Sequence, residues 1–285
     1  MKDVTNAMRA HILTAAVPYI KQYTDQYVVV KYGGNAMIDE ELKKSVMKDL
    51  MLLQLVGVKV VLVHGGGPAI NSTLDAMKIE SRFANGLRVT DEATMDVVQM
   101  VLAGKVNKGL VADLTDLGGK AVGLCGVDGN MIQVHKQNDE LGYVGSIDTI
   151  DTSIIDDVIS RGYIPVISSI GMGADGKTYN INADTVAAKI AGALKAETMV
   201  AMTNIDGVLR DVHDPSSLIS KITMAEADQL KAVGIIAGGM IPKVDCCLEA
   251  IKSGAQKVFI INGEIPHAIL IELLTDEGLG TMFVK

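Results

Sequence analysis

Two short apolar runs, each closed by a glycine turn, constrain the fold of this chain more than any other feature. Residues 27–32 run into the glycines at 33–34, and residues 58–63 run into a His-Gly-Gly-Gly turn at 64–67. Both runs are β-branched and almost wholly apolar, which is typical of strands buried on both faces of a parallel sheet. A helix-like segment follows each turn, so the pattern predicts β-α-β units with short crossovers.

The same two turns predict a binding site for an anion. Glycines at the carboxyl ends of parallel strands leave backbone N–H groups free to converge on one negatively charged group. Lys31 stands beside the first turn. One such turn alone is more often an ordinary tight turn, but two of them with a lysine indicate a phosphoryl group that is transferred rather than only held.

A third glycine motif does not belong to this pattern. Gly171, Gly173 and Gly176 follow a strand-like run with the spacing of the dinucleotide-binding fingerprint. That fingerprint requires a helix to begin among the glycines, whereas here the helical pattern begins only after Asn182. The Asp175-Gly176 pair therefore predicts a hairpin turn. The sequence also contains no Walker A motif and none of the protein-kinase catalytic motifs.

Composition excludes several classes of function. The 285 residues suffice for one large α/β domain or two lobes, and 48% of them are hydrophobic. The formal net charge of −8 argues against a nucleic-acid binder, because phosphates require a basic surface. No apolar run approaches the ~20 residues of a membrane span. Cys125, Cys246 and Cys247 have neither zinc-site nor disulfide spacing, which favours the reducing cytoplasm.

The chain divides into three expected parts. The apolar positions of residues 1–24 trace one helical face that Pro18 interrupts, which predicts a kinked amphipathic helix packed on its own domain or on another subunit. Two lobes are expected at 25–195 and 196–285, because the pattern of a long helix ends near residue 195 and the pattern of a new strand begins there. Within the first lobe, a helix is expected at 91–106, and turn signals predict hairpins over 121–147.

Two later segments add charged residues that could act with Lys31. Asp184 stands at the start of an alanine-rich helix, where Asn182 is an ordinary N-cap; a functional role for Asp184 requires a lysine partner, Lys31 or Lys243. Lys243 lies in the first turn of another helix, where its charge opposes the helix dipole, as expected of a functional residue. The histidines at 64, 135 and 267 have no metal-ligand spacing, so surface or packing roles are the default for each.

Together, these motifs resemble the amino acid kinase family. The segments at 31–37, 64–68, 85–90, 180–184 and 238–243 follow the order of that family, and the resemblance runs from about residue 10 to the C-terminus. It implies a three-layer α/β/α sandwich on a mainly parallel sheet. It further implies that the lobe at 25–195 binds an amino acid and forms a dimer, while the lobe at 196–285 binds ATP.

The resemblance also implies a reaction, in which ATP with Mg²⁺ phosphorylates the γ-carboxylate of N-acetyl-L-glutamate during arginine biosynthesis. An acceptor carboxylate is already ionised near pH 7, so the reaction needs no general base. Lys31 and Lys243 would stabilise the transferring group from opposite sides, and Asp184 would hold both lysines. The alternatives are a sister kinase acting on acetylaminoadipate or a carrier-bound acceptor, and a non-catalytic amino-acid sensor.

Further roles follow from the resemblance alone. Phosphate-binding N–H groups are expected from Gly33, Gly34, Gly66 and Gly67. Substrate-binding residues are expected to be Gly66, Gly67, Arg88 and Asn180. Nucleotide-binding residues are expected to be Thr203, Asp206, Gly207, Leu209, Gly239 and Met240. No side chain is expected to ligate a metal directly, and Asn204 departs from the aspartate of many family members, which bears on nucleotide or Mg²⁺ handling.

The two ends of the chain resemble the arginine-inhibited branch of the family. This resemblance implies a homo-oligomer, either a dimer or a hexamer of interlaced dimers, that is inhibited by L-arginine. The inhibitor would bind between the N-terminal helix and the C-terminal segment. The residues expected there are Tyr19, His267, Glu272, Gly278 and Gly280.

Overall fold

The computed structural model describes residues 5–285, the side chain of Asn35 excepted, and its centre is an eight-stranded sheet. The strand order is β12-β14-β13-β11-β1-β2-β8-β5, and all neighbours are parallel except β13 and β14. The strands are β1 (Tyr27–Tyr32), β2 (Lys59–His64), β5 (Ala121–Cys125), β8 (Ile164–Ser168), β11 (Thr198–Thr203), β12 (Lys221–Thr223), β13 (Lys257–Asn262) and β14 (Thr281–Val284).

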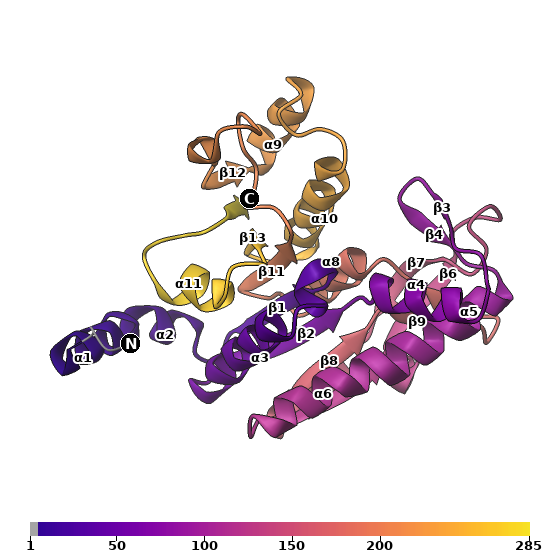
Figure 1. The fold of residues 1–285 in the computed structure, drawn as a ribbon, viewed down its shortest axis with the longest axis horizontal. Helices are drawn as coiled ribbons and strands as arrows, with labels where there is room; N and C mark the ends of the chain where they lie inside the picture. The colour runs from indigo at the N-terminus through magenta and orange to yellow at the C-terminus, as the bar shows by residue number, and fades with distance from the viewer. Residues whose placement is uncertain (1–4) are drawn as a thin grey trace.

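Helices cover both faces of this sheet, as Figure 1 shows. One layer contains α3 (Glu40–Leu55), α6 (Asn107–Asp116) and α11 (Ala268–Leu274), and the other contains α7 (Ser153–Ser160), α8 (Ala183–Ala193), α9 (Met224–Ala232) and α10 (Met240–Ser253). Val28 and Val30 of β1 enter the core of the first layer, and Val29 enters the core of the second. Successive side chains of a strand point to opposite faces of the sheet, so a strand that is apolar at every position needs a packed layer on both faces. The predicted three-layer sandwich is confirmed.

The register of β1 and β2 brings the two glycine turns together. Lys31 pairs with Val63, and Tyr32 pairs with His64, so both strands end at the same level. After β1, the chain forms a 3₁₀ turn, η1 (Gly34–Met37), and Asp39 then caps α3 by accepting N–H donors from Glu41 and Leu42. After β2, the triplet leads directly into α4 (Gly67–Ala76).

A four-stranded sheet and a hairpin lie at one end of the main sheet (Figure 1). The small sheet has the order β10-β9-β6-β7, from β6 (Ile132–Lys136), β7 (Gly145–Ile150), β9 (Ile170–Gly173) and β10 (Thr178–Asn180); the hairpin pairs β3 (Arg82–Ala84) with β4 (Leu87–Val89). The antiparallel β9–β10 pair confirms the turn at Asp175-Gly176 and the rejection of a dinucleotide fingerprint. The hairpin expectation was wrong for 121–125, which pairs in parallel with β8, because a short apolar run does not specify its partner.

The helix expected at 91–106 is longer and less regular than predicted. It runs through α5 (Glu92–Gln99), a π-helical stretch η2 (Met100–Val106) and α6 without a break. The π-turns shift the helical register, so the apolar pattern changes phase there while the chain stays helical. Two short 3₁₀ turns, η3 (Asp128–Asn130) and η4 (Pro215–Ser217), complete the elements.

The N-terminal segment forms two helices, α1 (Asn6–Ala15) and α2 (Val17–Tyr23), with Pro18 in the first turn of the second. The kink is confirmed, and residues 1–4 of the predicted segment lie outside the described residues. The second helix packs against α11, whereas α1 projects from the end of the molecule and buries none of its side chains (Figure 1). Among the described residues, no helix combines the length and apolar character needed to cross a membrane.

Candidate active site

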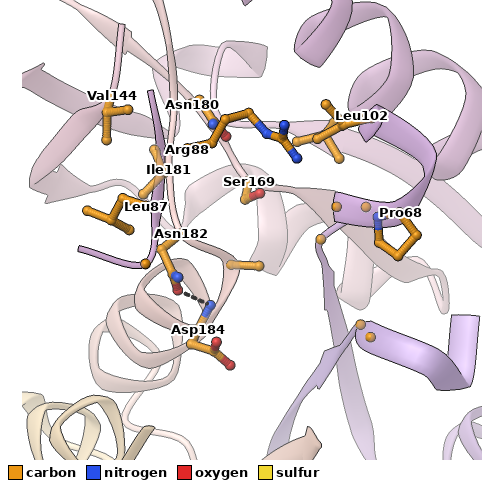
Figure 2. Close-up of a pocket in the computed structure, with 18 of the residues that line it drawn as sticks. Pro68, Leu87, Arg88, Leu102, Val144, Ser169, Asn180, Ile181, Asn182 and Asp184 are labelled. Atoms are coloured by element: carbon orange, nitrogen blue, oxygen red, sulfur yellow. Dashed lines mark hydrogen bonds between the residues drawn. The ribbon is translucent and has the colours of Figure 1, made fainter. Parts of the chain in front are cut away.

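A cavity of about 320 Å³ lies where the two glycine turns meet. Strand ends, helix starts and the β3–β4 hairpin all contribute to its lining (Figure 2). The expected site residues on this lining are Lys31, Gly33, Gly34, Gly66, Gly67, Arg88, Asn180 and Asp184. The structure therefore brings the expected phosphate-binding and acceptor-binding residues into one cavity.

Lys31 and Asp184 form an ion pair on the floor of this cavity. Lys31 Nζ lies 3.0 Å from Asp184 Oδ1, with the two side chains 11% and 25% exposed. Asp184 is held at the start of α8, where its N–H donates to the N-cap Asn182 at 2.8 Å (Figure 2). A Cβ on Gly33 would lie 3.4 Å from Lys31 Nζ, so the ammonium group reaches directly beside the first glycine turn. The predicted lysine partner of Asp184 is thus Lys31.

In the second glycine turn, position 66 has no room for a side chain. Gly66 is the N-cap of α4, Gly67 begins the helix, and both line the cavity, so a helix start with its unpaired N–H groups lies at the cavity wall. A Cβ on Gly66 would lie 2.7 Å from Leu102 Cδ2 of η2. The glycine lets the backbone pass under Leu102 and keeps its N–H within reach of a ligand.

Arg88 is fixed across the cavity by three neighbours. Its guanidinium donates to Asn71 Oδ1 at 2.6 Å and to the Ser81 hydroxyl, and its Cζ lies 4.7 Å from the centre of the Phe83 ring. Burial lowers the pKa of Arg88 from its ordinary value, yet a guanidinium remains charged in proteins. The N–H donors left over can bind a carboxylate. Asn180 lies close by and donates to Thr90 Oγ1 at 3.3 Å.

Lys243 lies apart from the main cavity. Together with Asp184, Thr203 and Cys246, it lines a second, much smaller cavity on the other side of the Lys31–Asp184 pair. Among the described residues, Asp184 forms an ion pair with Lys31 and none with Lys243. Burial raises the pKa of Cys246 to about 11, which makes it a neutral packing residue.

The expected nucleotide-binding residues lie around the carboxyl end of β11 and the start of α10. Thr203 ends the strand, and Gly239 and Met240 begin the helix that carries Lys243. Two of the others have structural partners: Asp206 accepts a hydrogen bond from Asn262 at 2.7 Å, and Leu209 bridges to Leu218. Gly207 has φ of 147°, and a Cβ there would lie 2.5 Å from Thr281 Oγ1. Tight packing alone therefore requires glycine at this position.

The residues expected to bind arginine lie in α2, at the start of and within α11, and in the segment that follows α11. His267 Nδ1 lies 2.6 Å from the buried Asp49, whose pKa burial raises to about 6. Glu272 accepts hydrogen bonds from the N–H groups of Leu279 and Gly280, at 2.7 and 3.0 Å. The last residues of the chain are thereby tied to α11, next to Gly278. Tyr19 of α2 packs on the same apolar core as α11.

Several residues around the site carried no recognisable signal in the sequence. Arg88 is held by Asn71 of α4, Ser81 of the loop before β3 and Phe83 of β3, and Ser169 lines the same cavity. Among the described residues, no group of three or more His, Cys, Asp or Glu side chains could hold a metal ion. His64 is fully buried, which excludes the surface interpretation and leaves the packing one.

The model of the amino acid kinase family matches residues 26–262. This chain belongs to the amino acid kinase family. Within that family, it is similar along its full length to acetylglutamate kinases: it is 52% identical over 287 residues to that of Brachyspira hyodysenteriae, with all of both chains covered. It is 54% identical over 275 residues to that of Clostridium kluyveri, covering 96% of this chain and 97% of the relative.

Solved structures share the fold of this chain. The chain resembles N-acetylglutamate synthase from Neisseria gonorrhoeae, complexed with coenzyme A and N-acetyl-glutamate, with a TM-score of 0.84 and 26% identity. The match covers 97% of this chain and 63% of that longer one. Carbamate kinase from Giardia lamblia bound to AMP-PNP matches at a TM-score of 0.65 and 18% identity, over 91% of this chain and 98% of that one, which shows the fold alone. The expected family and fold are confirmed.

Proposed function

We propose that this family member transfers the γ-phosphoryl group of ATP to the γ-carboxylate of N-acetyl-L-glutamate, the second step of arginine biosynthesis. One observation carries the proposal: a single cavity holds Arg88 and Asn180 opposite the Lys31–Asp184 pair and the glycine turns. An acceptor with two carboxylates fits this arrangement, one at Arg88 and the other at the phosphoryl-binding end. The similarity to acetylglutamate kinases supports the same substrate.

The residues of the cavity account for the chemistry of acyl phosphate formation. The acceptor carboxylate is ionised near pH 7 and needs only to be brought in line with the phosphoryl group. Lys31 neutralises charge on the transferring oxygens, while Asp184 keeps its ammonium group at 3.0 Å and so prevents it from swinging away. The N–H groups of Gly34, Gly66 and Gly67 add donors that cannot be titrated. Arg88 anchors the substrate carboxylate that does not react.

Mg²⁺ enters this reaction with ATP. Because no cluster of acidic or histidine side chains among residues 5–285 can hold the ion, its ligands are expected to be the phosphates of the nucleotide. Bound there, it neutralises phosphate charge during transfer. Lys243 is placed by α10 on the far side of Asp184, beside Thr203, where a nucleotide at the second lobe would bring its phosphates.

The test is ATP-dependent formation of an acyl phosphate, trapped as a hydroxamate. N-acetylglutamate would be compared with glutamate, aspartate and acetylaminoadipate as acceptors. Product from N-acetylglutamate alone supports the proposed reaction. Product mainly from acetylaminoadipate would identify the sister kinase. Both acceptors must be compared, because one extra methylene changes the free energy of discrimination by only about 1–3 kcal/mol. No product from any acceptor would favour an amino-acid sensor.

We also propose that L-arginine inhibits the enzyme and that the N-terminal helices join dimers into a hexamer in the cytoplasm. The helix α1 exposes Met8, Ile12 and Leu13, an apolar row that needs a cover. The helix α2 behind it contacts α11, so a subunit bound at α1 would act on the segment that holds His267 and Glu272. Removal of residues 1–24 should leave a dimer that arginine does not inhibit. A deletion variant that remains hexameric or arginine-sensitive would contradict this.

A further inference from the structure

His64 lies directly beneath the second glycine turn and is completely buried. Its Nδ1 is 2.8 Å from the carbonyl oxygen of Gly65, and its Nε2 is 3.0 Å from Nδ2 of Asn107. A buried polar ring is costly unless its nitrogens are paired, and here both are. The role of each nitrogen depends on which one carries the hydrogen, and the surroundings of Asn107 decide this.

The orientation of the Asn107 amide follows from its other neighbours. Its Nδ2 lies 2.8 Å from the carbonyl oxygen of Val166 and 3.3 Å from that of Leu124, so the nitrogen must face these two acceptors. Its Oδ1 has no hydrogen-bond partner within residues 5–285 and lies over Gly123, where a Cβ would overlap it. Turning the amide round would set its oxygen against two carbonyl oxygens. The amide has two hydrogens, and its two nearest acceptors are the carbonyl oxygen of Val166 at 2.8 Å and His64 Nε2 at 3.0 Å, so Asn107 is a donor toward His64.

The hydrogen of the His64 ring consequently sits on Nδ1. Nε2 accepts from Asn107 and must be unprotonated, which leaves Nδ1–H to donate to Gly65. Protonation of both nitrogens would place Nε2–H against the amide hydrogens of Asn107. Burial also favours this neutral form, because it lowers the pKa of His64 to about 4.

The bond to Gly65 also fixes the direction of the neighbouring N–H. The peptide between Gly65 and Gly66 is trans, as are all those of the described residues, so the carbonyl of Gly65 and the N–H of Gly66 point to opposite sides of one peptide unit. His64, to which the carbonyl points, is fully buried and does not line the cavity, whereas Gly65 and Gly66 do. Holding the carbonyl inward turns the N–H outward, toward the ligand.

We propose that His64 is a positioning residue, whose Nδ1–H holds the Gly65 carbonyl so that the Gly66 N–H is aimed at the transferring phosphoryl group. Asn107 fixes the tautomer of the His64 ring by donating to its Nε2. This inference rests on the proposed kinase reaction. It assigns a function to two residues 43 positions apart, neither of which lines the cavity.

The π-helical stretch η2 explains how Asn107 reaches His64. Asn107 follows its last residue, and Leu102 and Val106 of the same stretch close over Gly66, with a hypothetical Cβ there 2.7 and 3.3 Å from their methyl groups. The same stretch therefore packs against Gly66 through Leu102 and Val106 and leads directly into Asn107, which bonds His64. In a regular α-helix Leu102 and Val106, four residues apart, would still share a face, but Asn107, five residues after Leu102, would be turned further away; the π-helical turns reduce that rotation.

Two amide variants separate the two contacts of the ring. In His64→Asn, the amide nitrogen is two bonds from Cβ, as Nδ1 is in histidine, so it can still donate to the carbonyl oxygen of Gly65. In His64→Gln, the amide stands near Nε2, so it can still meet Asn107 but leaves the Gly65 carbonyl free. We expect kcat to stay near the wild-type value in His64→Asn and to fall about tenfold or more in His64→Gln, with little change in KM, because the lost interaction acts on the transition state.

A merely structural role predicts a different result. Loss of kcat would then follow the unfolding temperatures of the two variants, or be equal in both, and either outcome would overturn the proposal. The tautomer gives a readout independent of turnover: ¹⁵N NMR of histidine-labelled full-length protein should show His64, assigned by its absence in His64→Asn, as the Nδ1–H form. An Nε2–H form would refute the hydrogen bond to Gly65. If wild-type protein phosphorylates no acceptor, the proposed function fails, and this spectrum still decides the positioning contact.

Discussion

Acid should destabilise this protein through His64 in a way that one substitution removes. The ring is fully buried, and its pKa is lowered from 6.5 to about 4. Between these two values, the unfolded chain binds a proton at this residue and the folded chain does not. The free energy of unfolding therefore rises with pH over this window. The contribution is fully present above pH 6.5 and is lost as the pH falls toward 4.

The size of the effect follows from the two pKa values. Each pH unit between them changes the free energy of unfolding by about 1.4 kcal/mol, so the folded state should lose about 2 kcal/mol between pH 7 and pH 5, and about 3 kcal/mol by pH 4, through this residue alone. In His64→Asn this loss disappears, because an amide does not titrate. The difference in unfolding free energy between wild type and variant should change by that amount over the same range.

Urea unfolding followed by circular dichroism can measure this difference, since the chain has no tryptophan for fluorescence. Protein concentration must stay fixed, because assembly would add its own stabilisation. His213→Asn is the matched control, since it makes the same substitution at an exposed histidine. If wild type and His64→Asn show parallel pH profiles between pH 7 and pH 5, the neutral, buried state of His64 is refuted.

Three further outcomes are expected. Lys31→Ala should lower kcat more than tenfold in the hydroxamate assay while the circular dichroism spectrum is retained; unchanged turnover would contradict its role in phosphoryl transfer. Gly66→Ala should destabilise the fold by about 1–3 kcal/mol in thermal unfolding, because its Cβ would lie 2.7 Å from Leu102 Cδ2, and the same substitution should cost less when it is made in a Leu102→Ala background. Leu62→Ala, at a fully buried position of β2, should cost about 2–5 kcal/mol in urea unfolding, whereas Leu55→Ala, 73% exposed, should cost little.

Local patterns were sufficient for most elements and for the location of the site. The strand expected after residue 195 is β11, and the helices expected to begin near Asp184 and Lys243 are α8 and α10. These elements carry their own signals, such as β-branched runs and an N-cap at Asn182. The strand β14 gave no such signal, since Thr281–Val284 is short and becomes a strand only through its neighbours β12 and β13.

The candidate site divides in the same way. Lys31, Asp184 and the glycines were found because they stand at strand ends and helix starts, where short motifs are recognisable. The companions of Arg88 were not found, because Asn71 and Ser81 are common polar residues whose meaning depends on what lies against them. The separation of Lys243 from the Lys31–Asp184 pair also required the positions of α8 and α10.

Local sequence was enough to establish the parallel α/β sheet, the pair of glycine turns and the phosphoryl chemistry expected at their meeting point. These features depend on residues close together in the chain, where backbone conformation and side-chain alternation follow from local composition. The packed fold was needed to show which nitrogen of His64 carries a hydrogen and where the Gly66 N–H points. Those properties depend on Asn107, 43 residues away, and on two carbonyl groups of β5 and β8 that fix its amide. A hydrogen bond between distant segments leaves no periodicity in the sequence, so it becomes visible only when those segments are packed together.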